Sequence, residues 1–273
     1  MKERKTRNLL WYWVLFLAVG VNISACSSSK DVTSPTDDSS DDDTTTTTEV
    51  STGVYSFSDL VADSTATYTT STAPLYFSLE TGTVVDAKYA QSNKWDICFN
   101  SIYNSNICAN NGSLSASPGY GSTGIGQIYL DINSNIDAYY YQGAGLALKS
   151  VPTRDLFDSA FAATTSATTA SSNWEKTGVV GLDYFGGSTS GWAWYDFYGA
   201  LFPDSASSLV AHVCYALPRT VIVKTAKKGY YAKVVIYSLY KGAPEVPTRN
   251  NKSVFFTLKY AIQKDGTTNL DIK

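Results

Sequence analysis

Residues 219–240, near the C-terminal end, restrict the fold of this chain more than any other segment. They read RTVIVKTAKKGYYAKVVIYSLY, two runs rich in Val, Ile and Tyr on either side of a short polar stretch that ends at Gly229. Glycine accepts the positive φ of a tight turn, so the pattern predicts a β-hairpin. Each run contains three consecutive apolar residues, Val221 to Val223 and Val234 to Ile236. Strands of that kind are covered on both faces, which places the hairpin in the interior of a sheet.

Further strand patterns precede and follow this hairpin. Apolar residues alternate with others in residues 254–262 (VFFTLKYAI), which gives one apolar face, and Asp265–Gly266 follows as a turn. Shorter strands are predicted at residues 54–60, 75–79, 94–99, 127–132 and 192–198.

A single segment has the spacing of a helix. Apolar residues recur on one helical face over residues 154–163, and Thr153 precedes them as an N-cap candidate. The chain also contains 20 Tyr, 11 Phe and 19 Gly, a composition that favours strands and turns. We therefore expect one all-β domain over residues 53–273 with one short helix.

The first 25 residues have the organisation of a bacterial lipoprotein signal peptide. Four basic residues precede an apolar run at residues 9–21 that is short for a membrane span, and Ile23-Ser24-Ala25-Cys26 then resembles a lipobox. We expect cleavage before Cys26 and acylation of this residue, which anchors a protein at roughly 0.8 kcal/mol per buried methylene. The alternative is an ordinary signal peptide that leaves Cys26 unmodified.

Residues 26–52 are rich in Ser, Thr and Asp and contain little apolar surface, so we expect a disordered tether. The tether accounts for the acidic balance of the mature chain, because the part from Gly53 onward holds 16 basic and 16 acidic residues. A neutral domain without a basic face argues against nucleic acid as a partner.

The cysteines allow two interpretations. Cys98 and Cys108 lie symmetrically about Tyr103 with turn residues between them, so their spacing permits a disulfide across a hairpin. Two free thiols are the alternative. Cys214 is expected to be a small buried side chain.

Several segments, in this order, resemble one known family. They are SxxWDICF at residues 92–99, GSTGIGQ at 121–127, His212 shortly before a Pro, the 219–240 hairpin, and VFFTLKYAIQKDG at 254–266. Together they are similar to the HmuY-like surface lipoproteins of Bacteroidetes, over most of residues 75–268. The resemblance implies two packed, twisted antiparallel sheets and haem or a related porphyrin as the bound ligand. It also implies a lipid anchor in the outer membrane, display at the cell surface, and delivery of haem to an outer-membrane transporter.

This chain cannot supply the paired His or Met ligands that the resemblance leads one to expect. Its only Met is Met1, within the signal peptide, and its only His is His212. A haem iron would therefore take a Tyr phenolate, which favours ferric iron, with or without His212. The region where the family's ligands are sought holds Tyr103, Tyr129, Tyr139, Tyr140 and Tyr141, of which the three consecutive tyrosines are the candidates. The alternative for these tyrosines is a structural role in a strand or pocket wall, and a structural hydrogen bond is favoured for His212.

The sequence favours a binding protein over an enzyme. No GxSxG, HExxH or CxxC pattern is present, and a single His defines no catalytic triad. A glycan-binding lipoprotein is the alternative function, with the aromatic residues of the segment WAWYDFY as a platform for sugar rings: Trp192 and Trp194 first, with Tyr195, Phe197 and Tyr198. The same rings would otherwise pack in the core.

Overall fold

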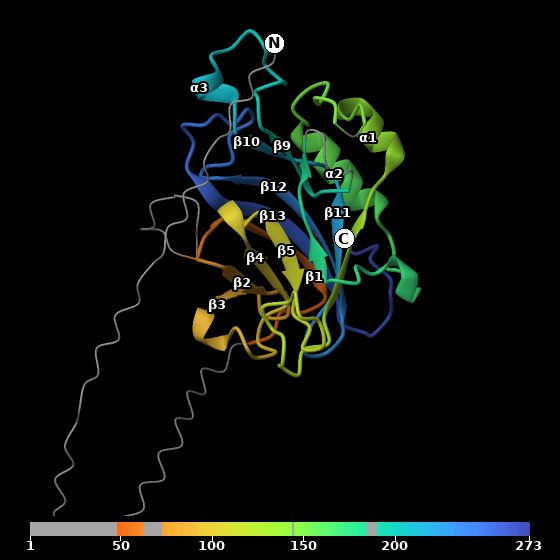
Figure 1. Ribbon diagram of the computed structural model, residues 1–273. Coiled ribbons are helices and arrows are strands. Elements are labelled where there is room, and N and C mark those ends of the chain that lie inside the picture. Colours follow the sequence, from red (N-terminus) through yellow and green to blue (C-terminus); the bar gives the residue numbers. More distant parts are fainter. Residues whose placement is uncertain (1–47, 63–72, 144, 185–189) are drawn as a thin grey trace, which may run out of the picture. The chain divides into compact units, whose positions relative to one another are not determined.

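Two five-stranded antiparallel sheets pack against each other in the computed structural model, which describes residues 48–62, 73–143, 145–184 and 190–273 (Figure 1). In spatial order, the first sheet consists of β1 (Gly53–Leu60), β13 (Ser253–Gln263), β12 (Tyr231–Tyr240), β11 (Thr220–Lys224) and β6 (Gln127–Asp131). The second consists of β3 (Thr83–Val85), β2 (Leu75–Ser78), β4 (Ile97–Asn100), β5 (Asn106–Ala109) and β7 (Val179–Val180). The expected all-β class with two packed antiparallel sheets is confirmed.

A small third sheet and several short helices accompany the sandwich. The sheet has the order β10 (Val213–Ala216), β9 (Ala193–Asp196) and β8 (Asp183–Tyr184), in which β8 and β9 are parallel. The α-helices are α1 (Ser134–Tyr140), α2 (Arg154–Ala163) and α3 (Ser207–Val210), and the 3-10 turns are η1 (Ala87–Tyr89), η2 (Ile102–Asn104) and η3 (Ser171–Asn173). Only α2 was expected from the sequence.

The predicted hairpin is the centre of the first sheet. β11 and β12 pair antiparallel with Val221 opposite Val234, and Gly229 in the turn has a φ of 68°. β11 is covered on both faces, because Val221 and Val223 join the main core while Ile222 packs with a separate cluster that includes Trp174. The run of consecutive apolar residues is thus explained by burial on both sides.

Aromatic contacts join the two large sheets. The ring centroids of Phe99 on β4 and Phe256 on β13 lie 4.0 Å apart in a stacked arrangement. Phe77 on β2 packs edge-on against Phe57 on β1 and against Tyr260 on β13, at 5.2 and 6.1 Å. Such pairs contribute about 0.5–1.5 kcal/mol each beyond the burial of their area, so the inner face of the sandwich is a main source of stability.

Helix α2 covers β12 on the face opposite the sandwich core. Its side chains Phe157, Ala160 and Phe161 are buried, as the helical spacing predicted. Lys233 of β12 is 2% exposed, and its Nζ donates to the carbonyl oxygens of Phe161 and Thr164, each at 2.8 Å. Those carbonyls belong to the C-terminal turn of α2 and have no partner within the helix. A buried cation therefore caps the helix and joins it to the sheet.

The predicted boundary between tether and domain at Gly53 is too late in the chain. Val50 donates its backbone N–H to the Glu80 carbonyl at 2.8 Å and packs against the core. Glu49 forms an ion pair with Lys264 at 2.6 Å. Residues 49–52 are therefore attached to the domain. The apolar contact and hydrogen bond of Val50 and the ion pair of Glu49 hold this short segment in place. The predicted signal peptide, Cys26 and the tether up to residue 47 lie outside the described residues.

In the part of the chain that the structure describes, no helix is both long enough and apolar enough to cross a membrane.

Candidate ligand-binding site

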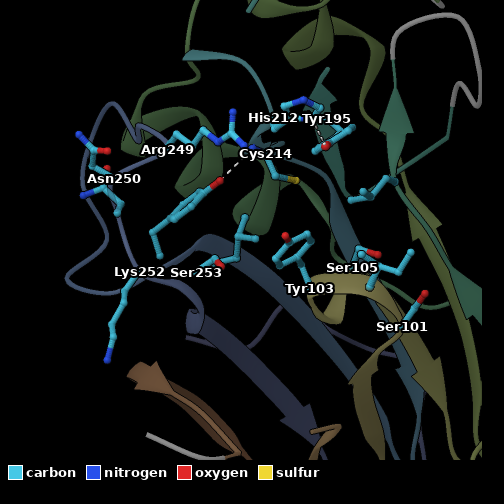
Figure 2. A pocket seen from close by; sticks show the side chains of 15 residues that line it. Ser101, Tyr103, Ser105, Tyr195, His212, Cys214, Arg249, Asn250, Lys252 and Ser253 are labelled. Atoms are coloured by element: carbon cyan, nitrogen blue, oxygen red, sulfur yellow. Dashed lines mark hydrogen bonds between the residues drawn. The ribbon is translucent and has the colours of Figure 1, made fainter. Parts of the chain in front are cut away.

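A cavity of about 840 Å³ lies where several separate segments of the chain meet (Figure 2). One wall is the turn at residues 101–105, which follows β4, and another is the small sheet of β9 and β10. The end of β12 and the loop at residues 249–253, which leads into β13, complete the cavity. Its volume is within the range of about 300–1,000 Å³ that is typical of small-molecule sites.

The walls of the cavity are mostly apolar. Ile102, Leu182 and Leu239 supply aliphatic surface, and Cys214 and Tyr240 are buried behind it. The backbone N–H of Cys214 donates to Tyr240 Oη at 2.9 Å, which holds the tyrosine ring in place. Burial raises the pKa of the Cys214 thiol to about 12, so this side chain presents a neutral surface to the cavity.

A hydrogen-bonded tyrosine–histidine pair stands in this apolar surrounding. Tyr195 Oη and His212 Nδ1 are 2.7 Å apart. Tyr195 on β9 is half-buried, whereas His212, directly before β10, is exposed. Burial raises the pKa of Tyr195, as do Cys214 and Tyr103, and Arg249 opposes the rise. Figure 2 shows the Tyr103 ring entering the same space from the turn after β4.

The charged side chains at the cavity are all cationic. Arg249 and Lys252 line it, and none of the described lining residues is Asp or Glu. The backbone N–H of Arg249 donates to the Leu209 carbonyl at 2.8 Å, which fixes this loop to α3 while the Arg249 side chain stays exposed. Asn250 and Asn251 add hydrogen-bonding groups beside the two cations. The cavity therefore favours an anionic ligand.

Backbone strain is concentrated around the cavity. In the described part of the chain, seven non-glycine residues have positive φ. Ser101, Tyr103 and His212 are among them and line the cavity, and Asn104 and Val254 directly adjoin lining residues. Such conformations cost on the order of 1–3 kcal/mol each and gather at binding and catalytic sites, where the surrounding structure imposes them.

Of the predicted ligand-binding residues, His212 lines this cavity and the three consecutive tyrosines do not. Tyr139 and Tyr140 belong to the end of α1 rather than to a strand, with exposed fractions of 70% and 0%, and the Tyr140 hydroxyl donates to Asp137. Tyr141 lies under the guanidinium of Arg219, 4.7 Å from its ring centroid. The ligand-binding interpretation of Tyr139, Tyr140 and Tyr141 is therefore wrong for this cavity.

A buried ion network fixes α1 in this position. Arg219 is 1% exposed, and its guanidinium lies 2.7 Å from Asp137 of α1 and 3.1 Å from Asp183 of β8. It also donates to the Gly191 carbonyl at 2.8 Å. Burial raises the pKa of Asp183, although Arg219 opposes this. The carboxylates of this cluster are held by Arg219, so their role is structural.

Trp192 and Trp194 belong to the core. Their exposed fractions are 1% and 0%, and Trp192 Nε1 donates to the Ser105 carbonyl at 2.8 Å. Sugar rings stack on exposed aromatic faces, so these two residues cannot form the predicted platform. The aromatic residues of this segment that do reach the surface are Phe197 and Tyr198, which follow the end of β9.

The cysteine pair is free in this structure. Cys98 and Cys108 are direct neighbours across β4 and β5, as the spacing predicted, but both are thiols. Cys108 Sγ donates to Asn100 Oδ1 at 3.3 Å. Of the two interpretations of this pair, the structure has the free thiols and not the disulfide. Both side chains are buried, so they contribute packing to the second sheet.

Within the described residues, no group of three or more His, Cys, Asp or Glu side chains could hold a metal ion. No family model and no curated protein sequence matches this chain. One solved structure to which the chain is similar is a candidate lipoprotein from Bacteroides fragilis NCTC 9343, with 13% sequence identity and a TM-score of 0.29. The similarity covers 69% of this chain and 83% of that one. At this TM-score we draw no conclusion from it about fold or function.

Proposed function

We propose that this protein binds haem or a related porphyrin in the cavity between Tyr103, Tyr195 and Arg249, without catalysing a reaction. The observation that carries this proposal is an apolar cavity of about 840 Å³ whose charged lining residues are all cationic. Haem is a flat, apolar ring with two carboxylates on one edge. The aliphatic walls suit the ring, and Arg249 and Lys252 suit the carboxylates, because guanidinium and ammonium groups form charge-assisted hydrogen bonds with them.

The proposal extends to the location of the protein. We propose a lipid anchor at Cys26 in the outer membrane, display at the cell surface, and delivery of haem to an outer-membrane transporter. The basic residues, the apolar run and the lipobox-like sequence before Cys26 support the anchor. Exposed lining residues such as Tyr103 and His212 leave the cavity accessible to solvent, which suits a protein that must release its ligand.

Titration of the purified protein with haemin and with metal-free protoporphyrin IX tests the proposal. Absorbance and quenching of tryptophan fluorescence report binding of each ligand. Arg249→Ala should lower the affinity for haemin and for protoporphyrin IX by about two- to fivefold, because it removes one exposed partner of a porphyrin carboxylate. Lys176→Ala is the matched control, since it removes an exposed cation that does not line the cavity. Failure of the wild-type protein to bind either ligand refutes the proposal.

Glycan binding remains the alternative, through the exposed aromatic residues of the segment WAWYDFY and not through Trp192 and Trp194. Phe197 packs edge-on against Tyr198 and His212, with ring centroids 4.8 and 4.6 Å apart, and Phe197 and Tyr198 are 47% and 67% exposed. Retention on a glycan array, lost in Phe197→Ala and combined with no porphyrin binding, would favour this alternative.

A further inference from the structure

The Tyr195 hydroxyl is held in a defined position at the cavity. β9 and β10 pair antiparallel with Tyr195 opposite Cys214. His212 precedes β10, and its backbone N–H donates to the Asp196 carbonyl at 2.7 Å. With a φ of 60°, His212 departs from extended backbone at this point, and its Nδ1 lies 2.7 Å from Tyr195 Oη. The strained backbone of His212 thus places its imidazole against Tyr195 and does not extend strand β10.

The other oxygen and sulfur atoms in tyrosine and cysteine side chains at this cavity are less suited to coordinate a metal. Tyr240 Oη accepts the Cys214 N–H, and Tyr240 is 5% exposed. The Cys214 thiol is kept protonated by burial. Tyr103 is on the turn after β4 and is 37% exposed, so its ring is less enclosed by the cavity walls than that of Tyr195. Tyr195 combines partial burial with a basic nitrogen beside its hydroxyl.

On the premise that the cavity binds haem, as proposed above, we infer that Tyr195 Oη is the protein's ligand to ferric haem iron and that His212 is the positioning residue for this oxygen. Ferric iron is a Lewis acid that accepts a Tyr phenolate as an axial ligand. Coordination would replace the O–H bond of Tyr195 by an O–Fe bond, and the released proton would leave to solvent. His212 Nδ1, 2.7 Å from Tyr195 Oη, would hold this oxygen in place.

This assignment predicts selectivity between two ligands of nearly identical shape. Metal-free protoporphyrin IX meets the same walls and the same cations as haem but offers no metal to Tyr195. The protein should therefore bind haemin more tightly than the metal-free ring, and the difference should depend on the Tyr195 hydroxyl.

The test measures the binding of both ligands to the purified wild-type protein and to five variants. Tyr195→Phe should abolish the phenolate-to-iron charge-transfer band of the haemin complex and lower the affinity for haemin by at least about tenfold. The affinity for protoporphyrin IX should stay within about twofold of the wild-type value. Tyr139→Phe is the matched control, because it removes an exposed hydroxyl outside the cavity. His212→Ala should weaken the band, and His212→Asn should restore it in part, because Asn tolerates positive φ and offers an acceptor oxygen near the place of Nδ1.

Three results would overturn the inference while the proposed function stands. They are an unchanged band in Tyr195→Phe, loss of the band in Tyr103→Phe instead, and a low-spin wild-type spectrum that His212→Asn and His212→Ala abolish equally. The last result would make His212 the iron ligand. Absence of binding of either ligand to the wild type would overturn the proposed function and, with it, this assignment. Protoporphyrin IX binding by each variant shows that the cavity is folded.

Discussion

Asp96 Oδ1 accepts a hydrogen bond of 2.8 Å from the backbone N–H of Ala226, 130 residues further along the chain. The other oxygen of the same carboxylate accepts from the N–H groups of Leu79 and Glu80, at 2.7 and 3.2 Å. Asp96 directly precedes β4 of the second sheet, and Ala226 lies in the turn of the central hairpin of the first. One carboxylate, 2% exposed, therefore joins the two sheets.

This arrangement predicts a dependence of stability on pH. Burial raises the pKa of Asp96 to about 6, although the hydrogen bond from Ala226 opposes the rise. In the unfolded chain the pKa is near 3.8, so the folded state binds this proton more tightly. The tighter binding of this proton therefore stabilises the folded state fully below pH 3.8, the unfolded pKa. This stabilisation, roughly 3 kcal/mol in the free energy of unfolding, is lost as pH rises through the folded pKa.

Urea unfolding of the wild type and of Asp96→Asn, at several pH values from about 4 to 7, measures this contribution. Asn does not titrate, so the variant should lack this part of the pH dependence, whatever its overall stability. Asp204→Asn, at an exposed position, is the control and should follow the wild type. Parallel pH profiles for the wild type and Asp96→Asn would show that the raised pKa is wrong.

Replacement of the buried lysine under α2 should loosen the helix. Lys233→Met keeps most of the apolar stem but removes both hydrogen bonds to the carbonyls of Phe161 and Thr164. We expect a loss of about 2 kcal/mol in the free energy of unfolding, because two buried acceptors lose their donor, partly offset by removal of a buried charge. The urea midpoint reports this change. Lys176→Met, at an exposed position, should leave it unchanged, and a Lys233→Met protein as stable as the wild type would contradict the capping role.

The cysteines should be inert in the folded protein. Burial raises the pKa of Cys108 to about 11 and that of Cys98 further still. A thiol reagent added to the Cys26→Ala protein should therefore label no cysteine in the native state. Three should be labelled in urea, namely Cys98, Cys108 and Cys214. Labelling of Cys214 alone in urea, restored to three by a reductant, would show that the cross-strand disulfide does form.

Cys26→Ala should release the protein from the membrane fraction of cells. The reason is that acyl chains on Cys26 would hold the protein at the membrane, at roughly 0.8 kcal/mol per buried methylene, and Ala accepts no acyl chain. Fractionation followed by immunoblotting measures the distribution, and Ser27→Ala beside it is the matched control. Continued membrane association of Cys26→Ala would count against the lipoprotein assignment.

Local patterns predicted β1, β2, β4, β6, β9 and the strands β11 to β13, but they missed α1 and the short strands β3, β5, β7, β8 and β10. The hairpin was predicted from β-branched runs on either side of Gly229, and its two strands pair between residues that are close in the sequence. In α1, Asn133 accepts from the Asn135 N–H as an N-cap, a signal that the sequence contained. The three consecutive tyrosines favoured a strand there. Asp137 of this helix forms an ion pair with Arg219, 82 residues away, a contact that no local pattern in the sequence indicates.

The candidate binding site shows the same division more sharply. The sequence by itself determined that this chain has one histidine, no methionine beyond Met1 and many tyrosines, and therefore which side chains it could offer to iron. Only the tertiary structure decided that Tyr195, rather than Tyr139 to Tyr141, stands beside His212, and that Arg249 faces the same cavity. The physical reason is that the cavity walls come from segments far apart in the sequence, which the packing of the sheets brings together. The burial of apolar surface stabilises the packed sheets as a whole. The local spacing of residues therefore does not indicate which side chains from distant segments come to face one another.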